Sequence, residues 1–213
     1  MPYYSPIIGY RPKRYSVEKT IDDLEVLLRK LGIRRFHLYG HSFGAMLAYE
    51  YLKRIAERKE DDEEGCLSAV LSSPCTSIPL LESEWARLLK ELPPSNPFTA
   101  NQRFRETHQC RTPGLPEPLA RAYRKSGSTW SGLAAIPDYV LTPPSENAAR
   151  MKSALLIRGE YDFSTEDCVK DFDQLFNHKF LRKKILEGCS HHGLLENGPM
   201  YGEILDSYFA EYD

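Results

Sequence analysis

One short stretch constrains the fold of this chain more than any other. An apolar run over Phe36–Tyr39 leads into Gly40-His41-Ser42-Phe43-Gly44, and residues with helical spacing follow directly. Gly-x-Ser-x-Gly between a strand and a helix places a serine hydroxyl on a tight, strained turn. We expect a side chain at either glycine to collide with the neighbouring helix or strand. The stretch therefore predicts that Ser42 is a nucleophile.

A serine hydroxyl is a weak nucleophile at neutral pH, so it needs a base and an acid that orients the base. Asp162 follows an apolar strand predicted at Ala154–Arg158, and a pair of histidines begins at His191, after a strand predicted at Lys179–Leu186. Open sheets of parallel strands keep their sites at the carboxyl ends of the strands. The order of Ser42, an acid and a histidine along the chain predicts a catalytic triad.

Several other residues compete for these roles. Asp167 and Asp171 are rival acids in the helix expected over Thr165–Phe176. His191 and His192 are adjacent, so only one of them can face Ser42. His41 is expected to line the turn structurally, because its side chain starts on the opposite side from Ser42. The remaining histidines are expected to have no functional role: His37, His108 and His178.

Composition excludes several classes of function. The 213 residues are 41% hydrophobic and 27% charged, as in ordinary globular domains. A formal net charge of −2 gives no reason to expect nucleic acid or a membrane surface as a partner. No apolar run reaches the roughly 18 residues of a membrane span, and no signal peptide is visible. No metal or cofactor motif is present, and the odd number of cysteines predicts reduced thiols in a cytoplasmic protein: Cys66, Cys75, Cys110, Cys168 and Cys189.

The pattern along the chain predicts four segments. Residues 1–15 form an irregular arm, and 16–73 form the first part of the core, opening with a helix over Val17–Leu31. Nine of the fifteen prolines lie from Pro93 to Pro144, which predicts that 74–152 is an inserted helical lid. Residues 153–213 return to alternating strands and helices and close with a helix over Leu194–Phe209.

With these motifs in place, the sequence resembles the α/β-hydrolase superfamily and, within it, the proline iminopeptidase family. The elbow at Gly40–Gly44, the segment Leu155–Asp162 and the segment Glu187–His191 carry the superfamily resemblance. His108–Arg111 and Pro116–Leu119 are similar to the family's lid. The resemblance implies a mostly parallel sheet and a serine hydrolase that releases an N-terminal residue, often proline, from short peptides or amides.

The resemblance also implies roles for particular residues. It favours His191 over His192 as the base and assigns the Phe43 amide to the oxyanion. Family members place a glutamate late in the lid to hold the substrate amine, and the stretch Gly132–Ile136 has no acid. Glu106 and Glu117 are left as candidate amine anchors.

The chain departs from the family at its start. Family members carry earlier strands and a His-Gly-Gly-Pro-Gly loop that supplies a second oxyanion donor, and residues 1–35 do not resemble either. We therefore expect an N-terminally truncated hydrolase fold in which the strand over Ile33–Tyr39 lies at an edge and allows self-association. Two alternatives remain open: a non-catalytic fold with little activity, and an amidase or esterase acting on a non-peptide substrate.

Overall fold

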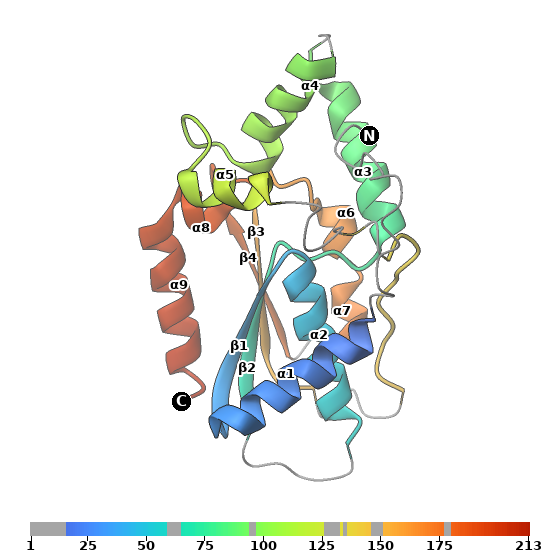
Figure 1. Ribbon diagram of the computed structural model, residues 1–213, viewed down its shortest axis with the longest axis vertical. Coiled ribbons are helices and arrows are strands. Elements are labelled where there is room, and N and C mark those ends of the chain that lie inside the picture. Colours follow the sequence, from blue (N-terminus) through green and yellow to red (C-terminus); the bar gives the residue numbers. More distant parts are fainter. Residues whose placement is uncertain are drawn as a thin grey trace.

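Four parallel strands form the centre of the protein, shown in Figure 1 as a computed structural model. The structure describes residues 16–58, 65–93, 97–125, 133, 136–145, 151–176 and 180–213. The predicted arm at 1–15, His178 and most of the stretch 132–136 lie outside the described residues.

The strands pair in the order β1-β2-β3-β4. They span Arg35–His41, Gly65–Ser72, Ala154–Gly159 and Leu181–Leu186. Each neighbouring pair is parallel. All four strands therefore end at the same edge of the sheet, where the loops after β1, β3 and β4 carry Ser42, Asp162 and His191.

The two faces of the sheet are buried by different helices. Ala69, Leu71 and Leu156 belong to the larger apolar cluster, whereas the intervening Val70 and Leu155 belong to a second cluster. This alternation follows from the two-residue period of a strand, because successive side chains point to opposite faces. All five side chains are apolar, as expected for the central strands of a parallel sheet that is covered on both sides.

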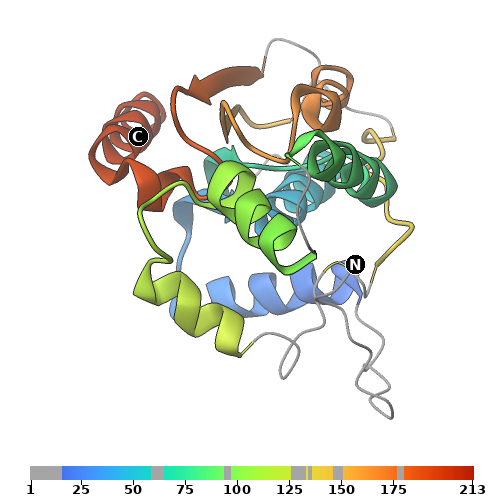
Figure 2. The same cartoon turned by 90° about the horizontal axis from the view of Figure 1, so that it is seen from above.

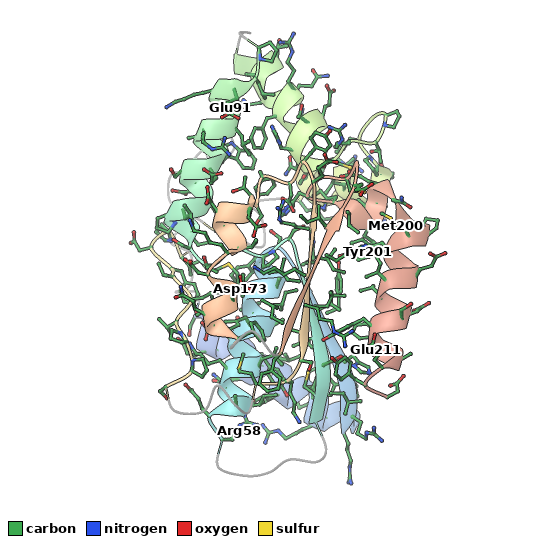
Figure 3. All side chains as sticks on the ribbon, turned by 180° about the vertical axis from the view of Figure 1, so that it is seen from behind. Arg58, Glu91, Asp173, Met200, Tyr201 and Glu211 are labelled. Carbon is green, nitrogen blue, oxygen red and sulfur yellow. The ribbon has the colours of Figure 1, made fainter. Side chains whose placement is uncertain are left out.

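Helices α1 (Val17–Leu31) and α2 (Phe43–Ala56) cover one face, and α9 (Gly198–Ala210) covers the other (Figure 1). Ser16 caps α1 by accepting a hydrogen bond from the Lys19 amide, and Gly32 ends it in a left-handed conformation at φ 65°. On α9, Tyr201 projects toward the sheet and is buried in the second cluster (Figure 3).

The segment predicted to be a lid lies between β2 and β3 in the chain, and we keep the name lid for it. It contains α3 (Ile78–Glu91), α4 (Pro97–Phe104), a π-helix η1 (Arg105–Gln109) and α5 (Glu117–Arg124). In Figure 2, which looks down on the carboxyl ends of the strands, these green helices lie above the sheet. The lid therefore covers the edge at which the candidate residues meet.

Two predicted helices are each divided. The segment expected over Thr165–Phe176 forms α6 (Glu166–Val169) and α7 (Phe172–Leu175), because the Asp173 amide bonds back only three residues, to the Lys170 carbonyl. The segment expected over Leu194–Phe209 forms α8 (Gly193–Glu196) and α9. Asn197 lies between them and caps α9 by accepting a hydrogen bond from the Met200 amide.

Strand β1 lies at an edge, as expected. Within the described residues it pairs with β2 alone. Apolar side chains are exposed near this edge, with Leu31 62%, Ile33 40% and Tyr39 37% exposed. An unpaired apolar edge can accept another strand. Self-association through this edge stays a prediction.

Candidate functional site

Ser42 lies on a strained turn between β1 and α2. Its backbone has φ 54° and ψ −118°, a conformation that residues other than glycine rarely adopt. The Ser42 amide donates a hydrogen bond of 2.8 Å to the carbonyl of Ser72, at the end of β2. The neighbouring strand therefore holds the turn in place.

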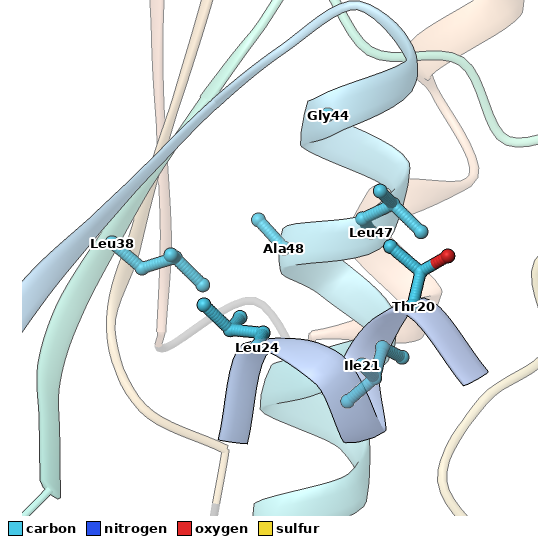
Figure 4. Close-up of a pocket in the computed structure, with 7 residues that line it drawn as sticks. All are labelled: Thr20, Ile21, Leu24, Leu38, Gly44, Leu47 and Ala48. Carbon is cyan, nitrogen blue, oxygen red and sulfur yellow. The ribbon is translucent and has the colours of Figure 1, made fainter. Parts of the chain in front are cut away.

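The two glycines of the turn have different roles. A Cβ at Gly40 would lie 2.2 Å from the Gly44 carbonyl oxygen, so the predicted collision is confirmed there. At Gly44 the prediction is wrong, because a Cβ would meet nothing within 4 Å. Figure 4 shows the reason: Gly44 lines an apolar pocket of about 210 Å³ between α2, α1 and β1, which Leu24 and Leu38 also line.

Asp162 and His191 are joined by a buried hydrogen bond. The Oδ1 of Asp162 lies 2.8 Å from the Nδ1 of His191, and the two side chains are 0% and 5% exposed. The Ser164 amide donates to the same Oδ1 at 2.8 Å, whereas Oδ2 is buried without a partner among the described residues. Because a carboxylate accepts the bond, Nδ1 carries the proton and Nε2 is left as the basic nitrogen. The rival acids Asp167 and Asp171 are exposed.

Two further histidine rings pack against His191. The centroid of the His41 ring lies 4.9 Å from that of His191 and 5.2 Å from that of His192, and the last two lie 5.2 Å apart. The Nδ1 of His41 is 2.9 Å from the Oγ of Ser72, which accepts a hydrogen bond of 2.6 Å from the Tyr201 hydroxyl. His41 thus lines the turn as expected, and it also contacts the candidate base.

Burial lowers the pKa of two of these rings. Burial and, to a smaller extent, the charge of the neighbouring His191 together lower the pKa of His41 to about 3. Burial is also the main cause that lowers the pKa of His192 to about 3. Among the described residues, a carboxylate is hydrogen-bonded to the ring of His191 and to neither of the other two rings. His41 and His192 are therefore neutral at pH 7.

Two residues that sequence reasoning missed also fix His191. The ring of Phe163 stacks on the His191 ring with centroids 4.0 Å apart. Ser73, at φ 50°, donates a hydrogen bond of 3.1 Å from its hydroxyl to the His191 carbonyl. Their positions gave a signal, because Phe163 directly follows Asp162 and Ser73 follows β2 as Ser42 follows β1.

Three predicted site residues remain: Phe43, Glu106 and Glu117. Phe43 is the first residue of α2, where backbone amides point out of the helix. Glu106 is exposed and accepts a hydrogen bond of 2.8 Å from Gln102. Glu117 is exposed and forms an ion pair of 2.8 Å with Arg124. Their roles toward an oxyanion or an amine stay predictions.

The cysteines are unsuited to nucleophilic work. All five are free and buried. Burial raises the pKa of Cys66 and of Cys75 to about 12, so their reactive thiolates are scarce at neutral pH. In the part of the chain that the structure describes, no three His, Cys, Asp or Glu side chains gather as metal ligands.

A model of the alpha/beta hydrolase family matches residues 7–199. This chain belongs to that family. The strained Ser42 turn and the acid and histidine after later strands agree with the membership.

Several proteins similar to this chain are proline iminopeptidases. A proline iminopeptidase of Lactobacillus acidophilus is 35% identical over 237 residues, which cover 98% of this chain and 77% of the relative. One from Lactobacillus delbrueckii subsp. bulgaricus is 28% identical, covering 93% and 73%. The solved proline iminopeptidase of Mycobacterium smegmatis has a TM-score of 0.73 at 18% identity, covering 96% and 74%. The chain is related to proline iminopeptidases and spans about three quarters of their length.

No helix within the described ranges is both long and apolar enough to cross a membrane.

The two glycines of the turn provide a matched pair of substitutions. Gly44→Ala should raise the free energy of unfolding by about 0.5–1 kcal/mol, because the methyl group enters open space and alanine favours the helix. Gly40→Ala should lower it by about 1–3 kcal/mol, because the Gly44 backbone has to move. Urea unfolding of the two variants measures both effects. Equal changes in the free energy of unfolding would contradict the different roles given to the two glycines.

The lowered pKa of the half-buried His192 predicts a loss of stability in acid. His192 has a pKa of about 3 when folded and about 6.5 when unfolded, so the unfolded chain binds more protons as the pH falls below 6.5. Between pH 7 and pH 5, protonation of His192 in the unfolded chain should lower the free energy of unfolding by at most about 2 kcal/mol. His192→Gln removes this loss and leaves the carboxylates unchanged. Urea unfolding at both pH values should therefore show a smaller fall for the variant, and an equal fall would refute the prediction.

Proposed function

We propose that this protein is a serine hydrolase in which Ser42 is the nucleophile, His191 the general base and Asp162 the acid that orients it. The buried hydrogen bond between Asp162 and His191 carries this proposal. It fixes the proton on Nδ1 and leaves Nε2 free to accept one. Strands β1, β3 and β4 bring these three residues to one edge of the sheet.

The chemistry follows from these roles. The Ser42 oxygen attacks a carbonyl carbon while its proton passes to His191 Nε2, which gives a tetrahedral oxyanion. The Phe43 amide and the positive end of α2 stabilise the oxyanion. The imidazolium then gives its proton to the leaving amine as the carbon–nitrogen bond breaks. Water, activated by the same nitrogen, hydrolyses the acyl-enzyme and restores Ser42.

The neighbours of His191 support this cycle. His41 and His192 stay neutral at pH 7, so they do not compete for the proton that leaves Ser42. Phe163 stacks on the ring and Ser73 holds the main chain of the base. The base is therefore held in one orientation through both proton transfers.

For the substrate we propose an N-terminal residue, often proline, released from a short peptide or amide. Relatives at 27–35% identity bear the name proline iminopeptidase. A helical lid above the strand ends leaves room for a small substrate more readily than for an extended chain. Glu106 or Glu117 would hold the free amine.

The triad is tested by covalent labelling with a fluorophosphonate. Ser42→Ala should abolish labelling, because the attacked oxygen is lost. His191→Ala should slow labelling by at least about a thousandfold, whereas His192→Ala should slow it far less, because His192 has no carboxylate partner. Gel fluorescence against time measures all three rates. Labelling of Ser42→Ala at the unaltered rate would show that the nucleophile is another residue.

The substrate class is tested by comparing leaving groups. We expect turnover of Pro-, Ala- or Leu-naphthylamide, with proline preferred, alongside p-nitrophenyl butyrate as the ester control. Each amide should lose activity when its α-amine is acetylated, because an amine anchor needs a charged N-terminus. Ester cleavage without amide cleavage would refute the peptidase proposal and leave the hydrolase proposal standing.

A further inference from the structure

We propose that His108, in the lid, is a positioning residue that aligns Asp162 with His191. The inference rests on the proposed function, since it concerns the same acid and base. His108 lies in the π-helix η1, and nothing in its sequence surroundings predicted a role.

His108 bonds to both loops at once. Its Nδ1 lies 2.8 Å from the carbonyl oxygen of Tyr161, the residue before Asp162. A carbonyl can only accept, so Nδ1 carries the proton and donates it. Its own carbonyl accepts a hydrogen bond of 3.3 Å from the amide of His191. One residue of the lid therefore joins the segment that carries the acid to the segment that carries the base.

The end of the π-helix explains the second bond. The Cys110 amide bonds to the Arg105 carbonyl, and the helix ends at Gln109, which leaves its last carbonyls without helical partners. His191 and His192 supply those partners, because the His192 amide donates to the Gln109 carbonyl at 3.1 Å. The carboxyl end of the π-helix is thus joined to the main chain of the loop that carries the base.

Arg111 makes a parallel connection from the same part of the lid. Its Nε donates a hydrogen bond of 3.0 Å to the Gly188 carbonyl, in the loop of the base. Its guanidinium carbon lies 3.9 Å from the centroid of the Tyr161 ring, in the loop of the acid. The lid is therefore fastened to both loops at two places.

The acid loop borders a pocket of about 300 Å³, which His108, Tyr161 and Asp162 line. The loop also bonds directly to the loop of the base, because the Tyr161 amide donates a hydrogen bond of 2.9 Å to the Cys189 carbonyl. On the lid side, the ring of His108 packs against a buried aromatic cluster. The His108 ring lies 5.2 Å from that of Phe104, which is buried and stacks on Trp85 with centroids 3.9 Å apart. His108 thus holds the acid loop in a fixed position relative to the lid.

Substitution of His108 by asparagine or by glutamine tests its two ring nitrogens one at a time. In His108→Asn the amide N–H lies near the place of Nδ1 and can still donate to Tyr161. In His108→Gln it lies near the place of Nε2, and His108→Leu has no donor. The first readout is the low-field proton resonance of the Asp162–His191 hydrogen bond, assigned by its loss in His191→Ala. The second is the fluorophosphonate labelling rate of Ser42.

We expect the resonance to persist in His108→Asn and to exchange about tenfold faster or vanish in His108→Gln and His108→Leu. Labelling should slow about tenfold in the last two, with kcat reduced and KM for a naphthylamide unchanged. His37→Leu is the matched control. It removes an Nδ1 contact of equal length, 2.8 Å to Ser68, outside the site, so it should leave the resonance unchanged.

The outcomes separate the two proposals. An intact resonance in His108→Leu would overturn the positioning role, whether or not the protein is active. Equal loss in His108→Asn and His108→Leu would also overturn it, because the donor would not matter. Loss of the resonance in His108→Leu, in a protein whose unaltered form is never labelled, would support the positioning role and reject the proposed hydrolase.

Discussion

The parallel direction of all four strands is the constraint on which the site depends. Because β1, β3 and β4 end at one edge, residues separated by well over a hundred positions in the chain meet there. Apolar side chains on both faces hold the strands between two layers of helix. The strain at Ser42 persists because the end of β2 bonds to its amide.

The surroundings of three neighbouring histidine rings give them different properties. The rings of His41, His191 and His192 pack against one another. A hydrogen bond to Asp162 distinguishes one of them. The pKa values of the other two are lowered to about 3, so His41 and His192 are neutral at pH 7. The same low polarity strengthens the Asp162–His191 bond.

The lid is part of this arrangement as well as a cover. The π-helix η1 ends on the amides of His191 and His192, and the side chains of His108 and Arg111 contact the acid loop. A lid attached in this way cannot lift at this point without breaking its hydrogen bonds to His191 and His192.

Local pattern determined much of this protein by itself. The sequence pattern predicted the strands β1, β3 and β4 and the helix over Val17–Leu31, and the Gly-x-Ser-x-Gly stretch predicted the strained turn. These features depend on interactions between residues that are close together in the sequence. Tertiary structure alone decided the open space at Gly44, the contact of His41 with His191 and the bonds made by His108. Each of these depends on chain segments that are remote in sequence, so no local pattern could reveal them.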